Sequence, residues 1–164
     1  MSEISARKIL LTPVGKLAIV ASEVAITELE FLSPKSSLKD FSNSPYAKAL
    51  VDLAATELGE YFEGKRKQFD FKLEPTGTQF QKQVWLQIQK VPFGKTVSYG
   101  AIAKALKKPN AARAVGGAVG ANPIPILIAC HRVMGSSGAL TGYSGGSGLP
   151  TKKKLLELEG IEYK

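Results

Sequence analysis

Cysteine and histidine each occur once in this chain of 164 residues, and they are neighbours, Cys130 and His131. One cysteine cannot form an internal disulfide, and the usual structural zinc sites need four ligands drawn mainly from these two residue types. The chain is therefore expected to fold around an apolar core without an internal disulfide or one of the usual structural zinc sites. Its 44% hydrophobic and 22% charged residues are ordinary for a globular protein.

Two domains are expected, with a boundary in the turn-forming run Glu74-Pro75-Thr76-Gly77. Residues 1–75 indicate a small α/β scaffold domain, and residues 76–164 a second domain. The predicted elements of the first are strands at 8–11, 17–21 and 25–32, a turn at 13–15, a polar loop at 33–44 and a half-buried strand at 69–73. A helix precedes that last strand, and its predicted apolar face consists of Tyr46, Leu50, Leu53, Ala54, Leu58 and Tyr61.

The second domain is expected to be mostly helical. Thr78 and Gln81 have the spacing of a capping box at the start of a helix. Its predicted apolar stripe consists of Phe80, Val84, Ile88 and Val91, and Trp85 is expected to be a core residue of the same helix. Two shorter helices, at 99–106 and 111–121, follow across a tight turn, with Asn110 as the expected cap of the second. This pair indicates a helix-turn-helix unit.

The helix expected at 111–121 contains almost only small side chains, including several glycines that each cost about 1 kcal/mol relative to alanine. Either the helix packs closely against another helix, or its backbone approaches a nucleic-acid groove. Arg113 favours the second explanation. It lies in the first turn, where the helix dipole disfavours a cation, so a partner outside the helix is expected to compensate.

The charge balance also suits a polyanionic partner. Lysine and arginine number 22 against 14 acidic residues, a net charge of +8. No run approaches the roughly 18 apolar residues of a membrane span. The first five residues, Met1 to Ser5, lack the basic and apolar regions of a secretory signal. Together with the free thiol, these features predict a cytoplasmic protein, or a nuclear one if the source is eukaryotic.

Cys130 and His131 follow the apolar run 126–129, which we expect to be a strand. An isolated cysteine usually behaves as a small core residue, but a neighbouring imidazole can take the proton of a thiol and make it a strong nucleophile. Successive side chains of a strand point to opposite faces, so proton transfer through one water is expected rather than a direct bond. A third group would then orient the imidazole.

The run from Asn122 to Val133 resembles the active-site motif of the O6-alkylguanine-DNA alkyltransferases, also called methylated-DNA–protein-cysteine methyltransferases. The resemblance continues through several motifs between Thr78 and Gly160. It implies an α+β fold, with a ribonuclease H-like N-terminal domain and a winged helix-turn-helix domain that carries the active site. One residue departs from the family pattern: Ala129 replaces the usual proline, which predicts a looser backbone before the cysteine.

The resemblance implies roles in DNA binding for the helix-turn-helix residues. The small-residue helix would enter the minor groove, and Arg113 would insert into the base stack while the damaged nucleotide flips out. Tyr99 would aid flipping and donate toward N3 of guanine, although its periodicity fits a core tyrosine equally well. Further implied DNA contacts are Ser98, Ala111, Ala112 and Gly116.

The resemblance also implies the parts of the reactive centre. Glu159, in the Leu-Glu-Gly ending of the last helix, would orient His131, while Glu157 faces solvent. Asn122 would link the recognition helix to the segment of the nucleophile. The implied pocket residues are Pro125, Val133 through its carbonyl, Tyr143, Ser144 through its backbone, and Gly145.

The reaction so implied is direct transfer of an alkyl group from O6-alkylguanine, and from O4-alkylthymine, in duplex DNA to Cys130. It needs no cofactor, acts once per molecule and suits a monomer. An oriented His131 predicts a pKa of the Cys130 thiol below its usual ~8.5. Three other functions fit parts of the pattern: a binding-only relative of this family, a cysteine hydrolase unrelated to DNA, and a helix-turn-helix regulator with an incidental cysteine.

Overall fold

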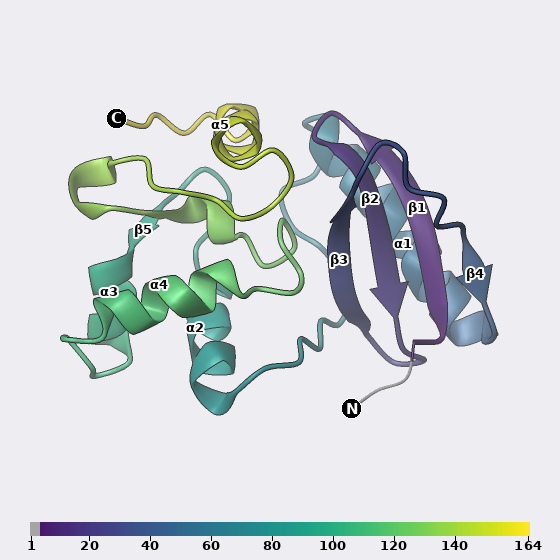
Figure 1. Cartoon of the computed structure of the whole chain (residues 1–164), viewed down its shortest axis with the longest axis horizontal. Helices are drawn as coiled ribbons and strands as arrows, with labels where there is room; N and C mark the ends of the chain where they lie inside the picture. Colours follow the sequence, from purple (N-terminus) through teal and green to yellow (C-terminus); the bar gives the residue numbers. More distant parts are fainter. Residues whose placement is uncertain (1–3) are drawn as a thin grey trace. The chain divides into compact units, whose positions relative to one another are not determined.

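The computed structural model describes residues 4–164. The expectation about a secretory signal concerned residues 1–5, of which Met1 to Glu3 lie outside the described residues. The chain divides into two compact units between Thr76 and Gly77 (Figure 1). One holds a small sheet and the other is mostly helical, so the predicted α+β fold is confirmed. Among the described residues, no helix is long and apolar enough to cross a membrane.

The first unit is a four-stranded sheet with one helix on a face. The strands are β1 (Ala6–Thr12), β2 (Gly15–Ala21), β3 (Ile26–Leu32) and β4 (Phe41–Ser42), in the order β3-β2-β1-β4. The tight turn between β1 and β2 pairs Thr12 with Gly15, whose φ of +110° suits glycine. The expected strands and turn are thus confirmed, whereas the short β4 lies inside the expected polar loop.

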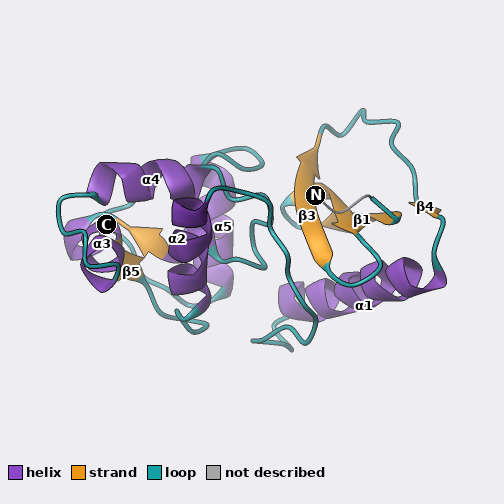
Figure 2. Cartoon of the chain, turned by 90° about the horizontal axis from the view of Figure 1, so that it is seen from below, coloured by secondary structure: helices purple, strands orange, loops and turns teal. Residues whose placement is uncertain are grey.

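Helix α1 (Pro45–Phe62) runs along one face of this sheet (Figure 2). Its buried positions include Ala47, Val51, Ala54 and Leu58, which are spaced as one helical stripe. The predicted face was partly wrong, because Tyr46 is 70% exposed and Leu53 is 40% exposed. The sheet contacts a stripe containing several alanines, so the largest apolar residues did not mark the buried face.

The strand predicted at 69–73 is not formed. Only Leu73 makes an isolated parallel bridge, with Ile26 of β3. Phe69 and Phe71 contact each other at a ring-centroid distance of 5.9 Å, and Phe69 lies 5.7 Å from the ring of Tyr61. The predicted alternation is confirmed, because these aromatic residues are half-buried between exposed neighbours, but ring contacts stabilise it rather than a strand ladder.

The second unit contains α2 (Gln79–Gln89), α3 (Tyr99–Ala105), α4 (Ala112–Gly120) and α5 (Leu149–Leu158). A parallel pair, β5 (Val97–Ser98) with β6 (Val133–Met134), joins the start of α3 to the segment after Cys130. The capping box at Thr78 and Gln81 is confirmed by hydrogen bonds in both directions. The buried Trp85 donates its indole N–H to the carbonyl of Ala118 at 2.9 Å, which fixes α2 against α4.

The helix-turn-helix pair consists of α3 and α4. The hydroxyl of Ser98 caps α3 by accepting from the Ala101 N–H at 3.0 Å. The chain leaves α3 at Lys107, which has a φ of +60°. The prediction that Asn110 caps the next helix is wrong. The cap position is taken by Ala111, one residue later, whose methyl group cannot accept a hydrogen bond.

Candidate active site

The backbone turns sharply at the nucleophile instead of forming the predicted strand. Ala129 has φ −76° and ψ 64°, and the Cys130 N–H donates to the Ile128 carbonyl at 2.7 Å. These values are those of an inverse γ-turn. A 3-10 helix, Cys130–Arg132, follows at once. Because a φ of −76° lies within the range that a proline ring imposes, alanine keeps here the conformation that the family's proline would fix.

Asn122 connects the end of α4 to the segment before Cys130. Its side-chain amide donates to the Ile128 carbonyl at 2.8 Å, and its side-chain oxygen accepts from the Ile124 N–H at 2.9 Å. Between them, the buried Ile126 has a φ of +72°, which costs a β-branched residue about 1–3 kcal/mol. The side chain of Asn122 and the surrounding apolar packing therefore stabilise a strained segment that ends at the nucleophile.

His131 and Glu159 form a fully buried pair. The His131 Nε2 and Glu159 Oε2 atoms are 2.6 Å apart, and both side chains have 0% exposure. An ionised carboxylate only accepts hydrogen bonds, so Nε2 carries the ring hydrogen and Nδ1 keeps its lone pair. Among residues 4–164, His131 Nδ1 is buried and has no hydrogen-bond partner. The pair therefore leaves a basic nitrogen available in the core.

The carboxylate of Glu159 also binds two other segments. It accepts from Arg132 Nε at 2.8 Å and Nη2 at 3.1 Å, and from the Gly94 N–H at 3.1 Å. Arg132 in turn donates to the Val91 carbonyl at 2.7 Å. Arg132 neutralises the buried carboxylate, a role that the sequence analysis missed. The pair joins the end of α5, the nucleophile segment and the turn after α2.

Burial controls the protonation of the reactive pair. It raises the pKa of the Cys130 thiol, although the polar side chains of Asn122 and Tyr143 and the charge of Lys152 act in the opposite direction. It also lowers the pKa of His131, against the raising effect of Glu159. Both groups are consequently neutral at rest. The prediction of a depressed thiol pKa is wrong, because desolvation of the thiolate outweighs its favourable contacts.

Lys152 is a charged residue that lowers the pKa of the Cys130 thiol, and the sequence did not predict this role. Its side chain is 1% exposed, and its ammonium donates to the Val133 carbonyl at 2.8 Å and to the Thr141 hydroxyl at 3.2 Å. The helical spacing of Lys152 with the buried Leu155 and Leu156 is the signal that would have found it.

Replacing Lys152 by methionine is expected to raise the pKa of Cys130 further, because the ammonium charge lowers that pKa in the unaltered protein. The measurement is the rate of Cys130 alkylation by iodoacetamide as a function of pH, whose midpoint should move to higher pH. The matched control is Lys153→Met, because Lys153 is the exposed neighbour on the same helix. Superimposable profiles for the Lys152 variant and the unaltered protein would contradict this expectation.

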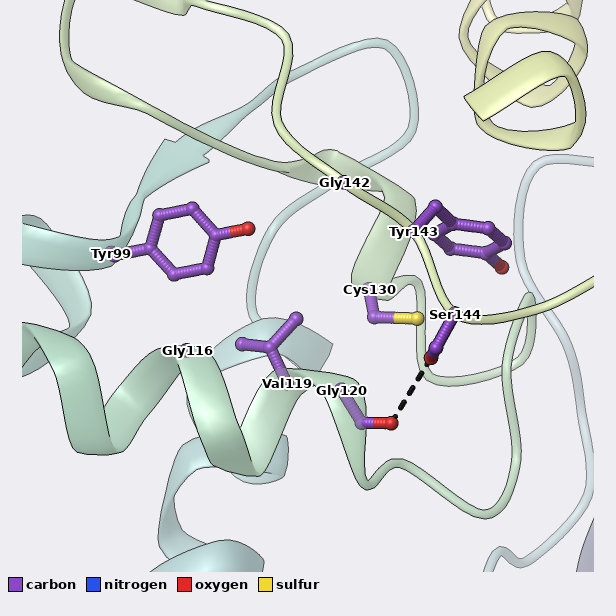
Figure 3. A pocket seen from close by; sticks show the side chains of 8 residues that line it. All are labelled: Tyr99, Gly116, Val119, Gly120, Cys130, Gly142, Tyr143 and Ser144. Atoms are coloured by element: carbon purple, nitrogen blue, oxygen red, sulfur yellow. Dashed lines mark hydrogen bonds between the residues drawn. The ribbon is translucent and has the colours of Figure 1, made fainter. Parts of the chain in front are cut away.

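A cavity of about 300 Å³ opens onto Cys130 (Figure 3). In that view the rings of Tyr99 and Tyr143 lie on either side of the cysteine, and the Ser144 hydroxyl donates to the Gly120 carbonyl at 3.1 Å. This bond connects the loop after the nucleophile to the end of α4. The lining residues are Tyr99, Gly116, Val119, Gly120, Cys130, Gly142, Tyr143 and Ser144.

The structure thus places Tyr99, Gly116, Tyr143 and Ser144 around Cys130. It does not bring the other predicted pocket residues to the cavity lining: Pro125 is buried in the turn before the cysteine, the Val133 carbonyl accepts from Lys152, and Gly145 lies outside the lining. Val119, Gly120 and Gly142 also line the cavity, and the sequence did not predict them.

Four of the predicted DNA-contacting residues lie at the beginnings of α3 and α4, and the fifth, Gly116, lies in the middle of α4. Ala112 and Arg113 are exposed in the first turn of α4, next to the half-buried cap residue Ala111, and Ser98 caps α3. Within the part of the chain that the structure describes, no three histidine, cysteine or acidic side chains are grouped so that they could hold a metal ion.

Comparison with known proteins identifies the family. The model described as 6-O-methylguanine DNA methyltransferase, DNA binding domain, matches residues 79–161, and the model of its ribonuclease-like domain matches residues 7–75. The chain belongs to the O6-methylguanine-DNA methyltransferase family. Among its curated members, the methylated-DNA–protein-cysteine methyltransferase of Methanosarcina acetivorans is 41% identical over 149 residues, which cover 91% of this chain and 94% of that protein. The constitutive enzyme of Bacillus subtilis is 43% identical over 157 residues, covering 93% and 94%.

Solved structures of the family share the fold of this chain. The Mycobacterium tuberculosis protein OGT, solved in complex with DNA, superposes with a TM-score of 0.80 at 40% identity, over 93% of this chain and 91% of that one. The O6-methylguanine methyltransferase of the same organism gives a TM-score of 0.79 at 37% identity, over 96% and 93%. The resemblance inferred from the motif at 122–133 and the predicted ribonuclease-like domain are confirmed.

Proposed function

We propose that this protein repairs DNA by transferring the alkyl group of O6-alkylguanine in a duplex directly to Cys130. The observation that carries this proposal is the position of the chain's one cysteine, in the lining of a cavity and directly before a buried His131–Glu159 pair. The family relatives named above are methyltransferases whose acceptor is a protein cysteine, and one solved relative is bound to DNA.

The transfer is an in-line displacement at the alkyl carbon. The Cys130 proton passes to His131 Nδ1 through one water, and the thiolate sulfur forms a bond to the alkyl carbon. The bond from that carbon to guanine O6 breaks, and its electron pair stays on the base, where a hydrogen bond from the Tyr99 hydroxyl stabilises the developing anion. The base becomes neutral guanine by taking up one proton from water, and His131 releases to water the proton that it gained. The product is a stable thioether, so each molecule acts once. None of these steps uses a cofactor.

The buried charges suit this proton transfer. Moving a proton from a neutral thiol to a neutral imidazole creates an anion and a cation inside the protein. Glu159 is bonded to the ring that becomes positive, and the charge of Lys152 favours the sulfur that becomes negative. Both electrostatic interactions become stronger as the charges develop, which is how an active site lowers a barrier.

Helix α4 is the proposed recognition helix for the minor groove. An added Cβ atom at Gly117 or Gly120 would meet no described atom within 4 Å, and at Gly116 it would lie 3.9 Å from the Tyr99 ring, an ordinary contact. Internal packing therefore does not require these glycines. Their small size supports the approach of a duplex instead, with Arg113 inserted where the damaged nucleotide is extruded and with Ser98, Ala111, Ala112 and Gly116 beside it.

Arg113→Ala is expected to slow repair of alkylated duplex DNA by about a hundredfold, while reaction with free O6-benzylguanine stays within about twofold. Free base needs no flipping, so only the duplex reaction depends on an inserted side chain. Single-turnover rate constants on both substrates are the measurement. The control is Lys104→Ala, an exposed cation on the preceding helix α3. Equal losses on the two substrates would show that Arg113 acts on the fold of the active site.

The two domains are proposed to have different roles. Residues 1–75 contain neither cysteine nor histidine, so we assign them a scaffold role and assign DNA binding and alkyl transfer to residues 76–164.

The oligomeric state, second substrate and location complete the proposal. The proposed reactive residues all come from one chain, which suits a monomer. O4-alkylthymine is the expected second substrate, because its alkyl carbon is attached in the same way. The protein is proposed to act in the cytoplasm, or in the nucleus if its source is eukaryotic.

A further inference from the structure

The hydroxyl of Thr141 lies between the buried Lys152 and the cavity residue Tyr99. Its Oγ1 atom is 3.2 Å from Lys152 Nζ and 2.8 Å from the Tyr99 hydroxyl. An ammonium group has donors only, so the Thr141 oxygen accepts from Lys152. The ammonium is held in this direction by its second bond, to the Val133 carbonyl at 2.8 Å. Thr141 takes no part in the proposed proton transfer or displacement.

A hydrogen-bond acceptor in the cavity fixes which way the hydroxyl hydrogens of Thr141 and Tyr99 point. If Tyr99 donated to Thr141, the Thr141 hydrogen and the acceptor in the cavity would both lose a partner, at a cost of about 1–3 kcal/mol for a buried group. If Thr141 donates to Tyr99, every hydrogen is used. The order Lys152 to Thr141 to Tyr99 therefore directs the Tyr99 hydrogen into the cavity.

We infer that Thr141 is a positioning residue that makes Tyr99 a hydrogen-bond donor to the flipped base. This inference rests on the proposed function and names the ring nitrogen N3 of guanine as the acceptor. The chain begins at a charged ammonium, and charge-assisted chains polarise each following donor. The Tyr99 hydrogen bond consequently strengthens as negative charge develops on the departing base, so the effect is on the rate of transfer rather than on binding.

The test compares Thr141→Val, which keeps the shape and removes the hydroxyl, with Thr141→Ser, which keeps the hydroxyl. Each variant is given duplex DNA with O6-methylguanine, or with its 3-deaza analogue, in which a C–H group replaces N3. On O6-methylguanine, Thr141→Val is expected to lower the single-turnover rate constant about tenfold with duplex affinity unchanged. Thr141→Ser is expected to keep the rate constant of the unaltered protein. On the 3-deaza analogue, all three proteins should react at one rate, slower than the unaltered protein on O6-methylguanine.

Two results would overturn the inference: an equal loss for Thr141→Val on both duplexes, which would mean that the residue only shapes its loop, or no loss on either. Thermal unfolding of the variants shows that they are folded, and the serine variant keeps the test decisive if the valine variant is not. Absence of transfer by the unaltered protein from both duplexes would instead contradict the proposed function, and the inference with it.

Discussion

Exchanging Glu159 for glutamine is expected to lower the free energy of unfolding by about 3–5 kcal/mol and to slow alkyl transfer at neutral pH by at least tenfold. The carboxylate has 0% exposure and neutralises Arg132. A neutral amide would leave that guanidinium buried without a counter-charge. The amide would also fail to stabilise the positive His131 ring that the proposed transfer creates, so fold and rate should decline together.

Chemical denaturation measures the first effect, and single-turnover transfer measures the second. The matched control is Glu157→Gln, on the exposed face of the same helix, which is expected to change the free energy of unfolding by no more than about 0.5 kcal/mol. An unfolding free energy of the Glu159 variant equal to that of the unaltered protein would show that the pair with Arg132 contributes nothing to stability.

The elements that sequence predicted well are those with a strong local signal. The capping box of Thr78 and Gln81 fixes the start of α2, a continuous apolar run marks β2, and a period-3.6 pattern marks the buried residues Val84 and Ile88. Gly160, with a φ of +71°, ends the last helix as its position after Glu159 predicts. In each case the residues that determine the element lie within a few positions of one another.

The turn at the nucleophile could not be predicted in this way. Its apolar run fits a strand equally well, and the bonds that select the turn come from Asn122, several residues earlier. The inverse γ-turn depends on the two backbone angles of Ala129, a residue type that adopts most conformations. Periodicity carries no information about an element of three residues.

The buried charges of the site were missed for a related reason. Arg132 and Lys152 belong to residue types that are almost always exposed, so a sequence pattern assigns them to the surface. Their burial depends on partners from distant segments: Glu159 for Arg132, and Val133 and Thr141 for Lys152. The predicted direction of the Cys130 pKa shift was wrong for the same reason, because desolvation of the thiolate depends on the packed core.

The most direct test of direct transfer is the intact mass of the protein after incubation with an excess of duplex containing O6-methylguanine. The expected result is the mass gained when one methyl group replaces the thiol hydrogen, located by peptide mapping on Cys130, with demethylated DNA formed up to one equivalent and no further. Cys130→Ser, which keeps the size of the side chain, should show no gain. An unchanged mass of the unaltered protein, or product formation beyond one equivalent, would contradict stoichiometric transfer to this cysteine.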